Sequence, residues 1–191
     1  MSLNPPGPVA VRAADDLKKN AYDPTTRQGV IESPRGSNRG PAIDIYNMAA
    51  GVPEGSCWCA SAVYYRLLMA AHALDVDLPA DLLLANGFAA AAAGAYADWA
   101  KRHGRWIAID AARSGSIVPM KGDLACFDIP AEHGIHHIGF VLSAGKGGAV
   151  TGEGNTHPDG ELTRDGYCVA VRRRSWEEFG PAGGFVRLPP L

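Results

Sequence analysis

One cysteine near the middle of the chain is well placed to act as a nucleophile. Cys59 follows a turn-rich segment, GVPEGSCW at 51–58, and opens an apolar run that continues to Ala73 without Gly or Pro. Gly and Ser before such a run indicate a helix start, where free backbone N–H groups and the helix dipole favour an anion such as a thiolate. A small buried core residue is the commoner role of a free cysteine, so this stretch alone leaves both roles open.

A cysteine nucleophile needs a base, and three histidines lie together in the second half of the chain. His133, His136 and His137 belong to the segment HGIHHIGFVLSA at 133–144. If this segment is a strand, His137 shares a face with Gly139, and apolar residues fill the other face. The glycine leaves room for a substrate or a backbone, which favours His137 as the base. For His133 and His136, a surface or satisfied core position is the commoner role.

A carboxylate and an amide follow in the segment TGEGNT at 151–156. Glu153 and Asn155 are two residues apart, so they point to the same face if the strand is regular. Either group could accept a hydrogen bond from the imidazole of His137 and fix its tautomer. A polar turn is the alternative, because the two glycines of this segment and Asn155 all favour turns.

The elements that must position these residues change in type along the chain. Helical signals fill the first half and strand signals the second half, after a Pro-rich flexible tail expected at 1–14. Helices are expected at 15–22, 42–50, 59–74, 79–84 and 88–103, and strands at 124–129, 135–143, 149–153, 167–173 and 185–188. The segment 106–109 is expected to be a strand or a turn. Helices followed by strands predict an α+β fold with an antiparallel sheet against a helical layer, in one domain at 15–191.

Composition and charge restrict the classes of function. The 191 residues are 47% hydrophobic and 20% charged, as in a globular domain. A formal charge of −2 gives no electrostatic reason to expect binding to nucleic acid or to an anionic membrane, and the one basic run, 172–174, is expected at a solvated edge. No metal or cofactor is expected, since the four cysteines lack zinc-site spacing and fit reduced thiols in a cytoplasm.

Five short motifs, taken in order, resemble the cysteine, histidine-dependent amidohydrolase/peptidase (CHAP) domains, which are relatives of the NlpC/P60 and papain-like enzymes. The motifs are SNRGPAIDIY at 37–46, GVPEGSCWCA at 51–60, KGDLACF at 121–127, HHIGFV at 136–141 and TGEGNT at 151–156. The resemblance implies a papain-like, NlpC/P60-like α+β fold. In that fold N-terminal helices, including the nucleophile helix, pack on a C-terminal antiparallel sheet.

The resemblance also implies roles for particular residues. Four positions match the family's catalytic set: the nucleophile Cys59, the general base His137, the acid Glu153 that orients the base, and the amide Asn155. Asp123, in the Gly-Asp turn before a strand, is expected to be structural. The chain departs from the family at Ala62, where an aromatic residue is common, and in the additional Cys57.

The activity that the resemblance implies is hydrolysis of an amide in peptidoglycan through a thioester acyl-enzyme. The bond is muramoyl–L-alanine or one within the stem peptide or cross-bridge. The partner is then the peptidoglycan peptide, with a phage, secretion-system or immunity protein as a further possibility. Two alternatives remain at this stage: a non-catalytic domain that binds wall fragments or packs inside a phage tail, and a papain-like amidase acting on a non-wall peptide.

The N-terminal segment does not resemble a Sec signal, and the apolar run at 82–97 is too short and too weakly apolar to span a bilayer. The expectation is synthesis in the cytoplasm and action on the wall after release or injection. Release would require phage lysis with a holin, a contractile injection system, or a tail structure that carries the domain.

Overall fold

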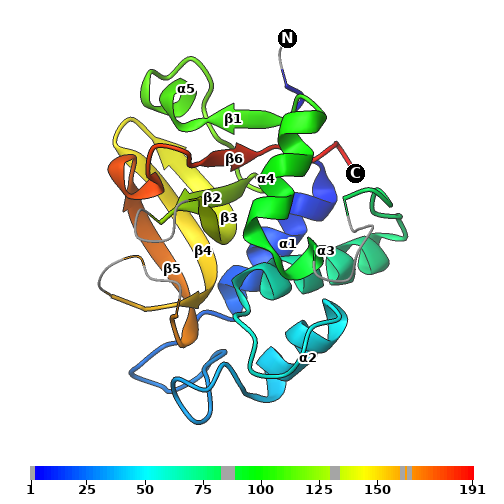
Figure 1. Cartoon of the computed structure of the whole chain (residues 1–191), viewed down its shortest axis with the longest axis vertical. Coiled ribbons are helices and arrows are strands. Elements are labelled where there is room, and N and C mark those ends of the chain that lie inside the picture. The colour runs from blue at the N-terminus through cyan, green and yellow to red at the C-terminus, as the bar shows by residue number, and fades with distance from the viewer. Residues whose placement is uncertain (1–2, 83–88, 130–133, 160–161, 163–164) are drawn as a thin grey trace.

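The computed structural model describes residues 3–82, 89–129, 134–159, 162 and 165–191. It is an α+β fold with a six-stranded antiparallel sheet, as predicted, and with helices packed against the sheet (Figure 1). The helices are α1 (Pro8–Lys19), α2 (Pro41–Ala49), α3 (Cys59–Leu74), η1 (Ala89–Ala91), α4 (Ala93–Arg102), α5 (Ile109–Arg113) and η2 (Glu177–Phe179). The strands are β1 (Trp106–Ala108), β2 (Leu124–Asp128), β3 (Ile135–Gly145), β4 (Gly148–Thr156), β5 (Cys168–Ser175) and β6 (Gly184–Val186).

The sheet separates two apolar clusters. Its strands lie in the order β1-β6-β2-β3-β4-β5, and each neighbouring pair is antiparallel. Along β3, Ile138 and Phe140 belong to the cluster that includes α1, α3 and α4, whereas Val141 joins Phe127 in the cluster on the opposite face. The predicted alternation of β3 is therefore confirmed, and it puts His137 on the same face as Val141.

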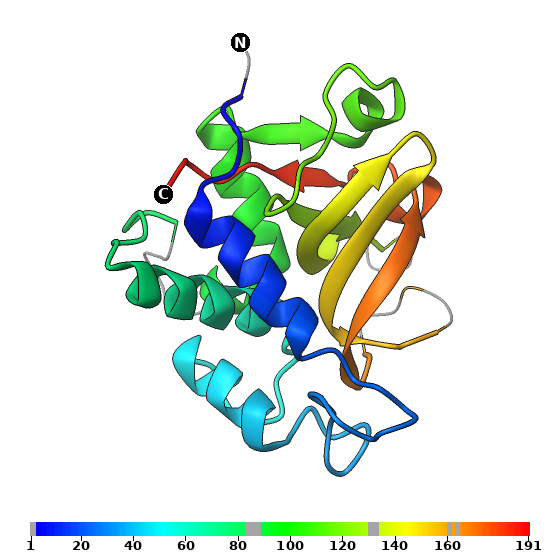
Figure 2. The ribbon, with the colours of Figure 1, turned by 180° about the vertical axis from the view of Figure 1, so that it is seen from behind.

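Residues 8–14 form part of a helix, so the prediction of a flexible tail over 1–14 is wrong for this segment. α1 begins at Pro8, a residue whose fixed φ suits the first turn of a helix. The helix buries an apolar stripe, Val9, Ala10, Ala13, Ala14 and Leu17. Val9 N also donates to Leu191 O at 3.2 Å, which ties α1 to the C-terminal residue. Figure 2 shows α1 beside the long β3–β4 hairpin.

Most other predicted elements are present with shifted boundaries. The segment predicted as a helix at 79–84 is a turn up to Leu82, and the rest of it lies outside the described residues. The helix predicted at 88–103 is divided into η1 and α4. The sequence did not reveal α5, because five residues are too few to show helical periodicity.

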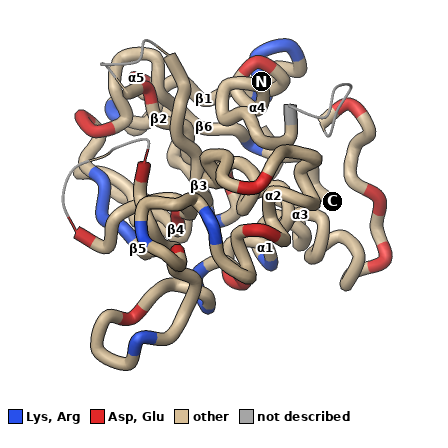
Figure 3. The backbone as a smooth tube through the Cα atoms, turned by 60° about the horizontal axis from the view of Figure 1, so that its bottom comes forward, with Lys and Arg blue, Asp and Glu red and all other residues tan. Residues whose placement is uncertain are grey.

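Charged residues of both signs are distributed around the molecule (Figure 3). Basic positions follow one another on β5, and Asp75 and Asp77 come directly after α3. Within the described residues, no helix combines the length and the apolar character needed to cross a membrane.

Candidate active site

Cys59 is the first residue of α3, as the sequence predicted. The N-cap residue Trp58 provides no side-chain hydrogen bond, and Ala62 N is bonded to Trp58 O at 2.9 Å. The N–H groups before Ala62 belong to the first turn, which has no acceptors within a helix. The side chain of Cys59 is buried, and its Sγ lies 3.9 Å from His136 O at the start of β3. The sulfur and free backbone donors therefore meet at one end of α3.

A buried hydrogen bond anchors the turn that leads into Cys59. Trp58 is fully buried, and its Nε1 donates to Glu32 Oε1 at 3.0 Å. The second oxygen of Glu32 accepts from Gly36 N at 2.6 Å. Asn47 of α2 donates from Nδ2 to Ser56 O at 3.1 Å, so two distant segments hold this turn. Sequence reasoning missed Glu32, because a single glutamate in a loop shows no pattern.

His137 lies on β3 and is completely buried. Its Nε2 is 3.0 Å from Glu153 Oε2, and its ring centroid is 5.6 Å from that of Phe127. Nδ1 is buried and has no hydrogen-bond partner among the described residues. Burial lowers the pKa of His137, but its interactions with Cys59 and Glu153 outweigh burial and raise that pKa to about 9. These interactions favour an imidazolium beside the sulfur.

Glu153, on β4, is the centre of a buried polar cluster. Its carboxylate accepts from His137 and from two atoms of Arg174, Nε at 2.9 Å and Nη2 at 2.8 Å. The hydroxyls of Thr151 and Thr156 donate to it at 2.6 and 3.1 Å. Burial alone would raise the pKa of Glu153, but Arg174 and His137 outweigh burial and hold that pKa well below its usual range. The carboxylate is therefore ionised and can orient the imidazole.

Two glycines allow the strands and α3 to approach closely enough. A Cβ at Gly139 would lie 2.8 Å from Glu153 Cγ, so this glycine leaves space for the carboxylate side chain. A Cβ at Gly154 would lie 2.9 Å from both Ala62 and Trp58, so β4 packs directly on the first turn of α3. The room predicted at Gly139 is thus used by Glu153, and Ala62 is the small partner of Gly154.

The basic run 172–174 was predicted to lie at a solvated edge, and this prediction is wrong for Arg174. β5 is an edge strand, but Arg174 is only 2% exposed. It pairs in register with Ala149 of β4 and lies on the same face as Glu153. Its charge is compensated by Glu153 and by Glu178, whose Oε1 is 3.0 Å from Arg174 Nη1. No local pattern indicates this pairing, because Arg174 and Glu153 are 21 residues apart in the chain.

Asn155 is fully buried near the end of β4, but the regular strand assumed for it is not present. The register of β4 against β5 shifts between Glu153 and Thr156, and Asn155 has a φ of +52°. The shift interrupts the alternation that was expected to align Asn155 with Glu153. Of these two residues, Glu153 is the one that bonds the His137 ring.

The remaining candidate histidines and the other cysteines occupy other positions in the fold. His136 contributes its carbonyl oxygen near Cys59, and His133 lies outside the described residues. Cys126 on β2 and Cys168 on β5 are buried, and burial raises the pKa of each thiol, that of Cys168 to about 12. Cys57 is half-buried, with Sγ 3.5 Å from Asp165 Oδ1.

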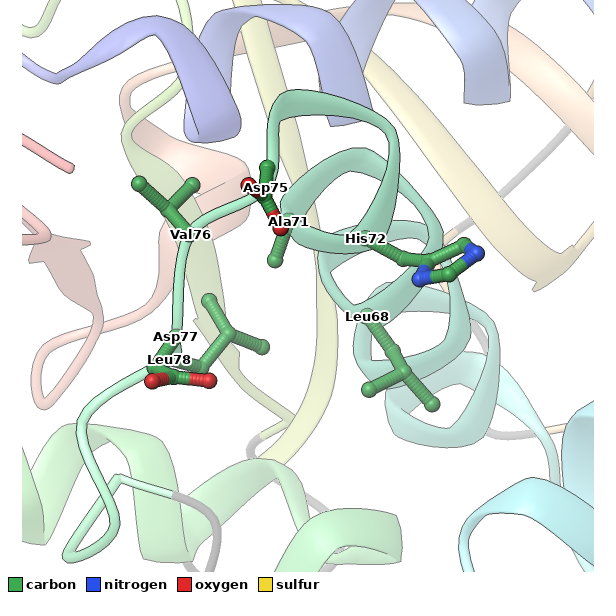
Figure 4. Close-up of a pocket in the computed structure, with 7 residues that line it drawn as sticks. All are labelled: Leu68, Ala71, His72, Asp75, Val76, Asp77 and Leu78. Carbon is green, nitrogen blue, oxygen red and sulfur yellow. The ribbon is translucent and has the colours of Figure 1, made fainter.

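Two cavities lie near opposite ends of α3. A cavity of about 240 Å³ is lined by Glu32 and Asp165, which contact Trp58 and Cys57 just before the nucleophile. A larger pocket of about 380 Å³ lies at the far end of α3, lined by residues from Leu68 to Leu78 (Figure 4). Figure 4 shows His72 and Leu68 extending from the helix and Val76 following it. Neither cavity is lined by Cys59, His137 or Glu153, but the smaller one lies beside the turn that leads into Cys59.

No family model, curated protein or solved structure matches this chain. Within the described residues, no group of three or more His, Cys, Asp or Glu side chains is arranged to hold a metal ion.

Proposed function

We propose that the chain is a cysteine amidohydrolase of papain-like, CHAP type that cleaves an amide bond in peptidoglycan. The observation that carries the proposal is the buried pair of His137 and Glu153, 3.0 Å apart, beside a cysteine at the start of α3. Nucleophile, base and orienting carboxylate are the three groups that covalent acyl transfer requires. The wall substrate is proposed from the five motifs that resemble CHAP domains.

The positions of these groups support the following reaction. The Cys59 thiolate attacks the amide carbonyl carbon, and the developing oxyanion accepts hydrogen bonds from the first N–H groups of α3. His137, as the imidazolium, protonates the leaving nitrogen, and the C–N bond breaks to leave a thioester on Cys59. His137 then removes a proton from water, which attacks the thioester; the C–S bond breaks, and this releases a carboxylic acid product and regenerates the Cys59 thiolate beside the imidazolium.

The ion pair explains why the base is buried. Inside the protein the attraction between charges is stronger than in water, so the Glu153 carboxylate supports the imidazolium that the thiolate needs. The substrate would approach Cys59 along the first turn of α3, since β3 and β4 pack against the other side of this turn. The cavity lined by Glu32 and Asp165 lies beside that turn, where part of the peptide could bind.

The test is digestion of purified sacculi. The wild type should lower their turbidity and release muropeptides, and mass spectrometry of the products should identify the cleaved bond. Cys59→Ser and Cys59→Ala should remove nearly all release while the circular dichroism spectrum stays that of the folded protein. Wild-type activity in Cys59→Ala would refute the proposed mechanism.

The same assay separates the alternatives. A wall-binding or phage-tail structural domain would cosediment with sacculi without releasing products. An amidase for other peptides would leave sacculi intact and release the amine from soluble peptide amides in a Cys59-dependent manner. Either result would replace the wall-hydrolase proposal.

A further inference from the structure

A buried guanidinium lies directly behind the carboxylate that orients the base. Arg174 donates from Nε to Glu153 Oε1 at 2.9 Å and from Nη2 to Oε2 at 2.8 Å. The same Oε2 is 3.0 Å from His137 Nε2. All three side chains are fully or almost fully buried. The Glu153 carboxylate is therefore shared between two groups. One is the imidazole of His137, which interacts with Cys59, and the other is the permanently charged guanidinium of Arg174.

We propose that Arg174 is a positioning residue of the catalytic centre, which keeps Glu153 ionised and fixed in the one orientation that presents Oε2 to His137. This inference rests on the proposed cysteine-hydrolase function. Arg174 acts only through Glu153 and has no role in binding the substrate.

The geometry of the fork supports an orienting role. A guanidinium that binds both oxygens of a carboxylate fixes its plane as well as its position. The Thr151 hydroxyl, 2.6 Å from Oε1, and the Thr156 hydroxyl, 3.1 Å from Oε2, hold the same carboxylate from two further directions. With these contacts made, Glu153 has no freedom to rotate away from His137.

Arg174 is itself held from its outer side. Glu178 of η2 accepts from Arg174 Nη1 at 3.0 Å, and its other oxygen accepts from Ser175 N at 2.8 Å. The titratable groups coupled in this centre come from several elements: Cys59 from α3, His137 from β3, Glu153 from β4, Arg174 from β5 and Glu178 from η2. The order of the strands places the arginine on the side of Glu153 away from the nucleophile.

The guanidinium also decides the charge of Glu153. A carboxyl group buried this deeply is driven toward its neutral form by desolvation, and a nearby cation reverses that preference. A neutral Glu153 would not stabilise the imidazolium of His137. Loss of Arg174 should therefore raise the pH at which Cys59 becomes reactive, even though Arg174 lies two side chains away from the sulfur.

The pair formed by Arg187 and Asp123 provides a matched control. Arg187 binds both oxygens of Asp123 at 2.9 and 2.7 Å, and this pair is buried to a similar degree. Among the described residues, the hydrogen bonds of Asp123 do not involve a histidine. The experiment compares Arg174→Met and Arg174→Lys with Arg187→Met and Arg187→Lys. It measures the rate of Cys59 alkylation by iodoacetamide against pH, with the modified residue located by fragment mass spectrometry, and the unfolding temperature of each variant.

We expect Arg174→Met to move the midpoint of the alkylation profile upward by about one pH unit or more, the size of effect that a neighbouring charge has on a carboxyl group. Arg174→Lys should keep the midpoint close to that of the wild type but lower the alkylation rate severalfold, because an ammonium carries the charge without the fork. Both Arg187 variants should unfold at lower temperature with an unchanged midpoint and rate.

A wild-type midpoint and rate in both Arg174 variants, with only a lower unfolding temperature, would mean that Arg174 is structural like Arg187. If Arg174→Met does not fold, Arg174→Lys decides the question, because a wild-type alkylation rate in that variant overturns the positioning role. Alkylation needs no substrate. A wild type that alkylates as expected but releases nothing from sacculi would therefore count against the wall-hydrolase function and not against this inference.

Discussion

Two buried ion pairs in this sheet have nearly the same geometry but different surroundings. Arg174 binds Glu153 through two hydrogen bonds of 2.9 and 2.8 Å, and Arg187 binds Asp123 through two of 2.9 and 2.7 Å. Both carboxylates are completely buried. Asp123 otherwise accepts from the backbone N–H of Met120, whereas Glu153 also bonds His137 and two threonine hydroxyls.

The pKa values of the two carboxyl groups are shifted in opposite directions. Burial raises the pKa of Asp123, and Arg187 with the Met120 N–H only partly offsets it. For Glu153 burial acts in the same direction, but Arg174 and His137 together reverse it, so that its pKa is lowered. An arginine fork alone therefore does not mark a functional carboxylate. The additional imidazole, with a cysteine beyond it, distinguishes the proposed catalytic pair from the structural one.

The largest effect is expected when that imidazole is removed. His137→Ala leaves Glu153 with Arg174 and the two threonine hydroxyls but without an imidazole partner, and it removes the proposed base. Muropeptide release should fall on the order of 10²-fold to 10⁴-fold, the range for loss of a positioned acid–base group. His136→Ala is the matched control, because alternation along β3 puts the side chain of His136 on the face opposite His137, and the variant should keep most of the activity. A large loss in His136→Ala with little loss in His137→Ala would mean that the site is built on the other histidine.

The second largest effect is expected to distinguish the carboxylate of Glu153 from that of Asp123. Glu153→Gln should lower muropeptide release roughly 10-fold to 100-fold, as does the loss of groups that orient metal-bound imidazoles. Asp123→Asn should leave release per folded molecule near that of the wild type. Both substitutions break a buried pair, and such changes cost about 3–5 kcal/mol of stability. Urea unfolding should therefore show similar losses for both, while sacculus digestion separates them. Equal activities in the two variants would mean that Glu153 and Asp123 do not differ in their contribution to activity.

A smaller effect is expected in the pH dependence of stability. The lowered pKa of Glu153 gives a contribution that is complete above its ordinary value of 4.5 and is lost as the pH falls below it. The raised pKa of His137 gives one that is complete below 6.5 and is lost as the pH rises through about 9. The raised pKa of Asp123 has the opposite sign to Glu153: its contribution is present below 3.8 and lost as the pH rises through the higher folded value.

Urea unfolding across this pH range can check these signs. Subtracting the Glu153→Gln curve from that of the wild type should give a difference that grows from acid to about pH 4.5. Over the same acid range, the difference between the wild type and Asp123→Asn should become smaller. Differences of the same sign for both variants would show that the two carboxylates do not differ in the way described.

Local sequence signals were enough to predict helix α3, which carries the proposed nucleophile, and strand β3, which carries the proposed base. The start of α3 at Cys59 follows from turn residues and an apolar run, and the face of His137 follows from alternation along β3. The α+β class follows from the order of helical and strand signals. Glu153 was matched to its role by a motif, and the 3.0 Å contact agrees with that match.

The parts that could not be predicted depend on pairing between distant segments. Arg174 and Glu153 meet because β5 pairs with β4, and nothing local distinguishes a buried arginine from the exposed Arg173 beside it. Glu32 reaches Trp58 through the tertiary fold alone. The helix from Pro8 was hidden because its proline-rich surroundings suggested a tail, while its apolar stripe is made largely of alanine.

The smallest effect concerns Asn155, the amide that competes with Glu153 for the role of orienting residue. The register shift after Glu153 gives Asn155 a left-handed backbone, while the Glu153 carboxylate bonds the imidazole directly. An amide can fix the tautomer of His137 but adds no charge, so it would stabilise the imidazolium less than a carboxylate. Asn155→Ala should therefore lower activity less than Glu153→Gln and leave the pH profile of Cys59 alkylation in place, whereas Glu153→Gln should move that profile upward. Asn155→Gly is the control for the backbone, because glycine tolerates positive φ and alanine does not. If Asn155→Ala moves the profile and Asn155→Gly moves it equally, while Glu153→Gln leaves it unchanged, the amide is the orienting residue and the Glu153–Arg174 pair is structural, like Asp123–Arg187.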